Sequence, residues 1–300
     1  MKNIRFAVIV FAMAMLAPLL ARAQEGPLDS SEPKGISTDE IIRRFAGKEK
    51  EFKLAREAYT YRQTLTVQTM DGRQVDGEFQ EVVDVLFDNK GRRMEQVVYA
   101  PQSSLRRIQM TREDFDDIQH RLPFVLTSDE VPEYQIMYVG QQQEDELHTY
   151  VFDVAPLRIE KDKRYFQGRI WVDDHDFQIV KTKGKNVPDI RKAKRGEENL
   201  FPEFTTWREQ IDSQDGTGRK FWFPTYTKAD DDLHFSGGDV HIREIVKYTN
   251  YKRFGANVKI TYEGQQLPTG PETKTPQGQQ QAQPPASQPP AQKPGPPGQN

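Results

Sequence analysis

The residues best suited to chemistry in this 300-residue sequence are acids and histidines, which cluster at two places. The first cluster is Asp173-Asp174-His175-Asp176, in the stretch QGRIWVDDHDFQIVKTKGK. Histidine and carboxylate side chains are common metal ligands and acid–base groups. However, this cluster lies between two runs rich in β-forming residues, where Asp and His are ordinary turn residues. We therefore predict the bend of a β-hairpin and not a catalytic site.

The second cluster, DDDLHFSGGDVHI, is the best candidate for a metal site. A hairpin at 236–239 would bring His234 and His241 together, and the ligands would be completed by Asp230, Asp231, Asp232 or Asp239. A metal-dependent hydrolase is nevertheless the weakest interpretation, because Asp-rich turns before a strand are common. The motifs Gly-x-Ser-x-Gly, Gly-x-x-x-x-Gly-Lys-Ser/Thr and His-Glu-x-x-His do not occur. We predict no catalytic residue, no metal and no cofactor, and hence no enzyme.

The N-terminus has the pattern of a cleaved secretory signal peptide. Lys2 and Arg5 flank the start of an apolar run at 6–20, which ends before the cleavage signal Ala21-Arg22-Ala23. This run is shorter than the roughly 20 residues that a membrane-spanning helix needs. The absence of cysteine excludes disulfides, thiolate metal sites and a lipid-modified N-terminal cysteine. We predict removal of residues 1–23 and a soluble periplasmic protein.

Charge and composition limit the partners of the mature chain. Loss of Lys2, Arg5 and Arg22 changes the formal charge from −3 to −6, and an acidic chain is a poor candidate for binding nucleic acid. Residues 263–300 are rich in Pro and Gln, so they are predicted to form a disordered tail, either a solubilising spacer or a docking segment. A linker at 24–36 and one domain at 37–262 complete the predicted organisation.

Two helices are predicted within this domain. Ser37 and Glu40 have capping-box spacing and open an amphipathic helix that extends to about residue 56. Thr111 repeats the pattern before a short helix that ends before Pro123. A further helical turn is expected from Asp189.

The rest of the domain predicts ten or eleven antiparallel strands joined by turns. Their ranges are 59–70, 77–88, 92–100, 134–140, 146–156, 164–172, 177–184, 204–212, 220–229, 241–254 and 257–264. Several strands carry apolar residues on both faces: at 150–155, Tyr150, Phe152 and Val154 oppose Val151 and Ala155. Two arrangements explain this pattern: a strongly curved sheet with helices in its concave side and a cavity for a hydrophobic ligand, or a filled sandwich or barrel.

Three stretches, YTYRQTLTVQ, FDNKGRR…VVYAP and GRIWVDDHDFQIVKTKGK, together with the order of the elements over roughly residues 40–255, resemble the LolA/LolB-like carriers that sort outer-membrane lipoproteins. The resemblance implies an unclosed, roughly eleven-stranded half-barrel whose helices form a lid. It also implies binding of acyl chains in the concavity, without covalent chemistry. Two features depart from the family: the Pro/Gln-rich tail is additional, and the lipoprotein branch requires a cysteine that is absent here.

The resulting hypothesis is a periplasmic carrier of acyl lipids or lipoproteins, with membrane donor and acceptor proteins as partners and only transient, peripheral contact with the membrane. Periodicity does not decide which sheet face is concave. The predicted cavity residues are the aromatic set Phe87, Tyr99, Tyr138, Phe152, Trp171 and Phe223, and the predicted lid residues are Ile41, Ile42 and Phe45. The alternative is a structural or regulatory interaction protein of the envelope with a filled β core and a docking tail.

Overall fold

The computed structural model describes residues 25–88, 92–121, 124–161, 163–193 and 196–254. The predicted signal peptide, the predicted strand at 257–264 and the predicted tail lie outside these residues. The predicted domain boundaries therefore stay predictions.

Helix α1 (Thr38–Arg56) begins where the capping pattern places it. The Ser37 hydroxyl accepts a hydrogen bond from the backbone N–H of Glu40 at 3.2 Å, which satisfies a donor that the helix itself cannot pair. Asp39 and Glu40 lie in the first turn and Lys53 and Arg56 in the last, so the charges complement the helix dipole.

Helix α2 (Arg112–Arg121) is capped reciprocally by Thr111 and Asp114. The Asp114 carboxylate accepts from the Thr111 backbone N–H at 2.7 Å, and the Thr111 hydroxyl accepts from the Asp114 N–H at 3.3 Å. A short 3-10 turn, η1 (Val131–Glu133), then leads into the second half of the sheet.

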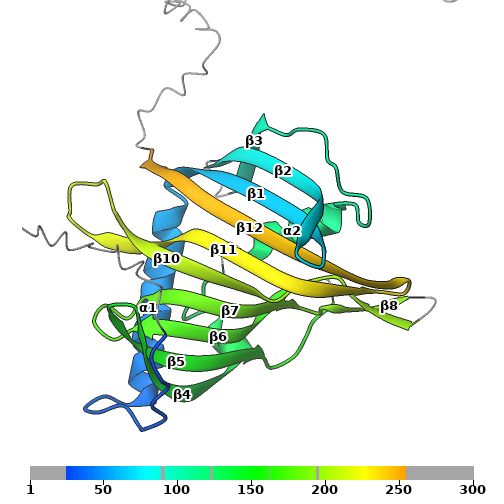
Figure 1. Ribbon diagram of the computed structural model, residues 1–300. Coiled ribbons are helices and arrows are strands. Elements are labelled where there is room, and N and C mark those ends of the chain that lie inside the picture. The colour runs from blue at the N-terminus through cyan, green and yellow to red at the C-terminus, as the bar shows by residue number, and fades with distance from the viewer. Residues whose placement is uncertain (1–24, 89–91, 122–123, 162, 194–195, 255–300) are drawn as a thin grey trace, which may run out of the picture. The chain divides into compact units, whose positions relative to one another are not determined.

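Within the described residues, twelve strands form one sheet, in the order β3-β2-β1-β12-β11-β10-β7-β6-β5-β4, with β8 and β9 attached beside β11 (Figure 1). Every pairing between these strands is antiparallel, as predicted. The strands are β1 (Tyr59–Asp71), β2 (Gln74–Phe87), β3 (Arg93–Tyr99), β4 (Tyr134–Glu144), β5 (Leu147–Pro156), β6 (Tyr165–Asp173), β7 (Ile179–Val187), β8 (Ile190–Ala193), β9 (Gly196–Asn199), β10 (Phe204–Asp212), β11 (Lys220–Phe235) and β12 (Gly238–Arg253).

The helical turn expected from Asp189 is wrong. The segment forms the short hairpin β8–β9, in which Ile190 pairs with Asn199, and His234 of β11 pairs with Asn199 in turn. The segment has no apolar stripe at helical spacing that would hold a helix against the core, whereas strand pairing satisfies its backbone groups.

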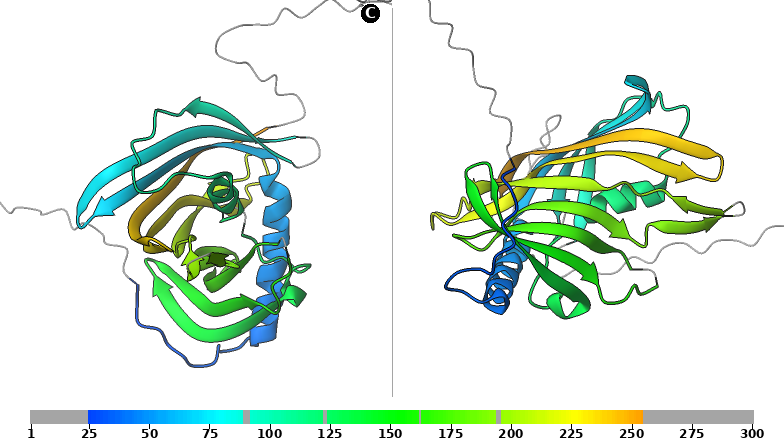
Figure 2. Two further views of the ribbon diagram at one scale, coloured as in Figure 1. Left: turned by 90° about the vertical axis from the view of Figure 1, so that its right-hand side faces the viewer. Right: turned by 60° about the horizontal axis from the view of Figure 1, so that its bottom comes forward.

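The sheet is strongly curved and stays open, because its end strands β3 and β4 do not pair with each other. β-bulges at Thr69/Met70, Tyr138/Gly140 and Trp171/Val172 are among the irregularities that bend it. In the left view of Figure 2 the strands wrap around α2, and α1 crosses the open side. The predicted fold, an unclosed antiparallel half-barrel with helices over its concave face, is confirmed.

Two facing glycines allow β6 and β7 to approach closely within this curve. Gly168 pairs with Gly184, and a Cβ atom on either residue would lie 2.2 Å from a backbone oxygen of the opposite strand. Both glycines belong to the stretch that carries the family resemblance. Their role here is therefore steric.

The two open edges of the sheet differ in how they are covered. Residues 25–29 run along β4, where Gly26 N–H donates to Gln143 O and Asp29 N–H donates to Gln141 O, both at 2.8 Å. Gly140 leaves room for this segment, since a Cβ there would lie 2.3 Å from the Asp29 oxygen. Among the described residues, nothing pairs with the outer side of β3.

Candidate functional site

Helix α1 packs its apolar stripe on the concave face of the sheet. Ile41 and Phe45 are fully buried, and the Phe45 ring lies 5.6 Å from the ring of Phe152. Ile42 is half-buried and packs against the same cluster. The three predicted lid residues thus lie between α1 and the sheet, and their role in opening stays a prediction.

The C-terminal half of α1 covers a second aromatic cluster. The Phe223 ring lies 5.1 Å from Phe52 of the helix, 4.7 Å from Tyr59 and 4.6 Å from Tyr251. Burial raises the pKa of Tyr251, whose hydroxyl donates a 2.6 Å hydrogen bond to the carbonyl of Pro224. A single helix therefore covers two aromatic clusters on the concave face.

A buried ion pair fastens the middle of α1 to the sheet. Nη1 of Arg208 donates to the two carboxylate oxygens of Glu49 at 3.0 and 3.2 Å, and both side chains are almost fully buried. The same guanidinium donates to the carbonyls of Ile179 and Phe124, at 3.3 and 2.6 Å. Burial raises the pKa of the Glu49 carboxyl, and Arg208 opposes that shift. The pair is isolated from water, so moving α1 away requires separating or hydrating two charges.

Sequence reasoning missed this pair, although a signal for it exists. Glu49 follows Ile41 and Phe45 at intervals of four residues and so lies on the apolar stripe of the helix. A carboxylate in that position needs a buried partner. The identity of Arg208 as the partner depends on the packing of β10 under the helix.

Exposed ion pairs hold the margin of α1. Lys50 binds Asp129 and Lys53 binds Glu130, each at 2.9 Å, and Ser128 N–H donates to Ala46 O at 3.2 Å. These contacts join the helix to the segment before η1. Pairs of this kind are worth roughly 0–1 kcal/mol each, so the margin is held more weakly than the centre.

Three of the predicted cavity residues lie near α1. Phe152 and Phe223 are fully buried beneath the helix. Tyr138 is partly buried, with its ring 5.5 Å from Phe152, and its hydroxyl donates to Ser31 O at 3.1 Å. The structure therefore brings Tyr138 and Phe152 together with the lid residues, and Phe223 into the neighbouring cluster.

The other three predicted cavity residues lie elsewhere. Phe87 packs in the cluster of β1, β2 and β12 that α2 covers, and Tyr99 of the edge strand β3 is 52% exposed. Trp171 lies on the outer face, because it pairs with Val151, whereas Phe152 pairs with Ile170 on the concave face. Side chains of adjacent residues in a strand point to opposite faces, so Trp171 and Phe152 do not share one cavity.

Trp171 has a polar cover of its own on the outer face. Its indole N–H donates to Gln142 Oε1 at 2.8 Å, and Nζ of Lys181 lies 4.4 Å from its ring. Lys181 also binds Glu144 at 3.0 Å and Glu25 at 2.5 Å, which ties the segment at 25–29 to this face. These contacts explain why the tryptophan is only 4% exposed.

Two grooves lie beside the part of the concave face that α1 covers. The first, here called the α1 groove, has a volume of about 780 Å³ and runs between α1, the β6–β7 turn and the β10–β11 hairpin. It is lined by Arg43, Arg44, Gly47, Lys48, Glu51, His175, Asp176, Phe177, Gln178, Gln210, Arg219, Lys220 and Phe221.

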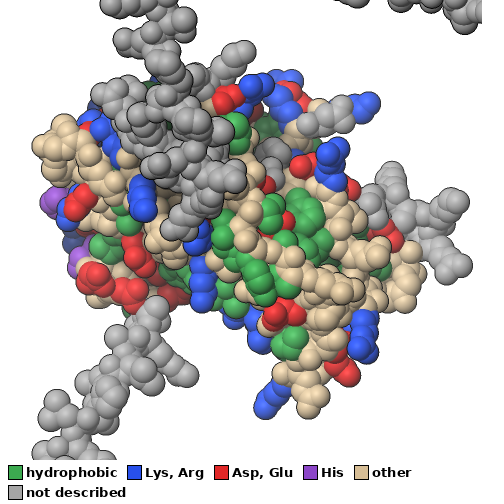
Figure 3. All heavy atoms as spheres, turned by 90° about the horizontal axis from the view of Figure 1, so that it is seen from above, with side chains coloured by type: hydrophobic (Ala, Val, Ile, Leu, Met, Phe, Trp, Pro, Cys, Tyr) green, Lys and Arg blue, Asp and Glu red, His purple; other side chains and the backbone are tan. Residues whose placement is uncertain are grey.

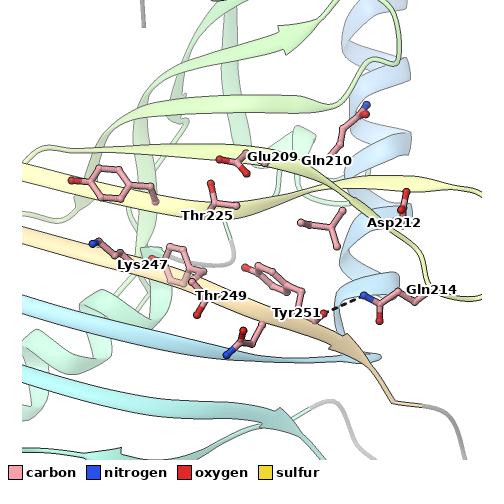
Figure 4. A pocket seen from close by; sticks show the side chains of 12 residues that line it. Glu209, Gln210, Asp212, Gln214, Thr225, Lys247, Thr249 and Tyr251 are labelled. Carbon is pink, nitrogen blue, oxygen red and sulfur yellow. Dashed lines mark hydrogen bonds between the residues drawn. The ribbon is translucent and has the colours of Figure 1, made fainter. Parts of the chain in front are cut away.

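The second groove, of about 740 Å³, lies where β11 and β12 separate (Figure 4). These strands pair only from Tyr226 and Lys247 onward, and Pro224 just before that point has no N–H to donate. Gln214 reaches across the opening and donates to Tyr251 O at 3.1 Å. The groove is therefore a gap between two strands of the sheet that the Gln214 side chain partly bridges.

The two acid and histidine clusters are structural elements of hairpins. Asp173 ends β6, and its carboxylate accepts hydrogen bonds from the N–H groups of His175 and Asp176 at 3.2 and 2.8 Å, which confirms the predicted bend. His234 binds Asp239 at 2.9 Å, while His241 binds Asp232 and Asp230 at 2.8 and 2.9 Å. Within the described ranges, no group of three or more His, Asp or Glu residues is placed to hold a metal ion.

In the described part of the chain, no helix combines the length and the apolar character required to cross a membrane. No protein-family model matches the sequence, and no curated protein matches it significantly.

Solved structures do show similarity to the chain. One is a DUF1329 family protein from Desulfovibrio piger, with 14% identity over 71% of this chain and 95% of that chain, and a TM-score of 0.33. Another is a LolA superfamily protein from Nitrosomonas europaea, with 13% identity, coverage of 70% and 95%, and a TM-score of 0.29. The Pseudomonas aeruginosa MucA/MucB complex matches at 10% identity, with coverage of 69% and 98% and a TM-score of 0.19. The resemblance to LolA-like proteins is thus found among solved structures too, while similarities of this size assign no function.

Proposed function

We propose that the protein is a non-enzymatic periplasmic carrier that binds the acyl chains of lipids or lipoproteins between α1 and the concave face of the sheet. The observation that supports this proposal is that one helix covers two aromatic clusters and is fastened by the buried Glu49–Arg208 ion pair and by exposed pairs at its margin. Residues 1–23 direct export, residues 37–262 form the binding domain, and membrane donors and acceptors exchange the cargo.

In this proposal, ligand binding displaces α1 from the aromatic residues that it covers. When α1 swings away, Phe152 and Phe223 lose their contacts with Phe45 and Phe52. An acyl chain then replaces the helix, and each buried CH2 group contributes about 0.8 kcal/mol. The cost of opening includes hydration of Glu49 and Arg208, so the empty protein stays closed and a long acyl chain is required to hold it open.

The first test is native mass spectrometry of the full chain isolated from a periplasm, followed by organic extraction and lipid analysis. Discrete mass additions that extract as acyl lipids are expected. A ligand-free mass, together with no binding of an uncharged fluorescent probe such as N-phenyl-1-naphthylamine, would reject the carrier function.

The second test loosens the margin of α1. The double variant Lys50→Ala/Lys53→Ala removes the ion pairs with Asp129 and Glu130, and is expected to accelerate binding of the uncharged probe severalfold. The matched control is Lys34→Ala/Lys252→Ala, which removes two exposed lysines outside α1. Equal association rates for both variants would show that α1 does not control access.

A second candidate function, an interaction protein with a filled core, is favoured by the open edge at β3. Met94, Val97, Val98 and Tyr99 are all about half exposed along this strand. Viewed from the side on which β3 lies in Figure 1, hydrophobic side chains gather in a patch (Figure 3). Uncovered edge strands with apolar side chains suit pairing with a strand of another protein.

The variant Val97→Lys tests this second candidate. It would abolish pairing with a partner strand, as measured by affinity capture, and would leave the lipid content of the protein unchanged, as measured by mass spectrometry.

A further inference from the structure

The α1 groove is positively charged although the chain as a whole is acidic. Its lining contains five cationic side chains, Arg43, Arg44, Lys48, Arg219 and Lys220, against the two carboxylates of Glu51 and Asp176. The cations come from both walls: three from α1 and two from the β10–β11 hairpin. Cations on opposite walls of a groove focus a field that attracts anions.

Much of this cationic hydrogen-bonding capacity remains available. Arg43 and Arg44 share one carboxylate, Glu40, and each guanidinium carries five donors. Arg219 binds Asp215, which lies outside the lining. No hydrogen bond or ion pair engages the Lys220 ammonium among the residues that the structure describes.

The two carboxylates of the lining are already engaged. Both oxygens of Asp176 accept hydrogen bonds, one from the Gln178 N–H at 3.0 Å and the other from the Trp222 indole N–H at 2.8 Å. Glu51 binds Lys48 at 3.1 Å, an exposed pair that water or an anion can replace. Counted together with Glu40 and Asp215, which bind the three arginines from outside the lining, the four carboxylates leave one positive charge in excess in the groove.

Aromatic rings lie next to the cations. The Arg44 guanidinium lies 4.9 Å from the centre of the Phe177 ring, and that of Arg219 lies 5.9 Å from the Phe221 ring. Guanidinium groups on aromatic faces keep their edges free to bind a planar or tetrahedral anion. A ligand that carries both a phosphate and an apolar portion finds a partner for each here.

We propose that the α1 groove is a binding site for a phosphate-bearing group, with a phospholipid head group as the source that also uses the rings. This inference rests on the proposed function in one respect only: the acyl chains of the same lipid would enter beneath α1, which forms one wall of the groove. A phosphate held by Lys48 and Lys220 would bridge the helix and the β10–β11 hairpin while α1 is closed, before the acyl chains enter.

The test uses the full chain and isothermal titration calorimetry. Dihexanoyl phosphatidic acid is expected to bind with a stoichiometry of one. Lys48→Glu/Lys220→Glu is expected to weaken that binding by roughly tenfold or more, because each lost contact is a charge-assisted hydrogen bond. The matched control, Lys34→Glu/Lys252→Glu, makes the same change of charge at exposed lysines outside the groove and is expected to stay within about twofold of the wild type.

Inorganic phosphate, titrated in the same way, distinguishes the two sources. If it binds as tightly and with the same dependence on Lys48 and Lys220, the site is confirmed and its ligand is free phosphate. If neither probe binds, or if both variants weaken binding equally, the site is rejected. The uncharged probe tests the acyl site separately. If the wild type does not bind this probe, the carrier function is rejected and the result has no bearing on the groove.

Discussion

At the scale of single residues, Glu49 and Arg208 are the most consequential pair. Glu49 lies on the apolar stripe of α1, and Arg208 lies on β10 beneath the helix. They stabilise α1 on the sheet only while both are present, because either charge alone would be buried without compensation.

Glu49→Gln is therefore expected to lower the free energy of unfolding by about 3–5 kcal/mol, since it leaves the Arg208 guanidinium buried without a counter-charge. Urea unfolding followed by circular dichroism measures the change. The double variant Glu49→Leu/Arg208→Met should recover most of that loss. A loss below about 1 kcal/mol for Glu49→Gln would show that water reaches the pair.

His241 gives a prediction about pH. The hydrogen bond with Asp232 is the main cause that raises the pKa of His241 above its ordinary value, and the hydrogen bond with Asp230 adds to it, while burial opposes them. Arg243 on the same strand face also contacts Asp230. Because the folded pKa is the higher one, the protonated imidazole stabilises the fold fully below about pH 6.5, and this contribution is lost as the pH rises through the raised pKa.

We expect the stability difference between the wild type and His241→Gln to shrink from pH 5.5 to pH 8.5. An NMR titration should find the pKa of His241 lowered by Asp232→Asn, while that of His234, which is raised mainly by its hydrogen bond with Asp239 and only in smaller part by Asp232, falls less. An unchanged His241 pKa in Asp232→Asn would contradict this account.

At the scale of elements, α1 depends on its buried side for stability. Phe45→Ala is expected to cost about 3–5 kcal/mol, because it leaves a cavity against Phe152. Leu54→Ala on the same helix is the matched control, since Leu54 is 66% exposed and its loss should stay within about 0.5 kcal/mol. Thermal or urea unfolding of both variants measures the difference. Similar losses would mean that α1 is not packed on the sheet through this face.

The helices and strands show where local signals suffice. Capping patterns at Ser37 and Thr111 predicted both helix starts, because a cap depends on neighbouring residues alone. The hairpin at Asp173 was predicted for the same reason. The segment from Asp189 was predicted as a helical turn and forms β8–β9, since its conformation depends on pairing with β11.

At the scale of the whole molecule, the carrier function requires α1 to open as a unit while the sheet persists. Hydrogen exchange is expected to show faster exchange of α1 amides than of those in β1 and β12, and further acceleration of α1 when an acyl ligand is added. Mass spectrometry of peptides from the exchanged full chain measures both rates. Exchange of α1 only in step with the whole sheet would contradict a separate opening motion.

The sequence by itself determined the antiparallel class, both helix starts, the acidic hairpin and the presence of apolar residues on both strand faces. Only the tertiary structure decided which face is concave, and therefore that Phe152 lies beneath α1 while Trp171 lies outside beneath Lys181. It also joined Arg208 to Glu49, and gathered Lys220 with Lys48 into one groove. The physical reason is that caps, turns and periodicity act between residues close in the chain, whereas the direction of curvature and the meeting of distant charges depend on how the whole sheet packs.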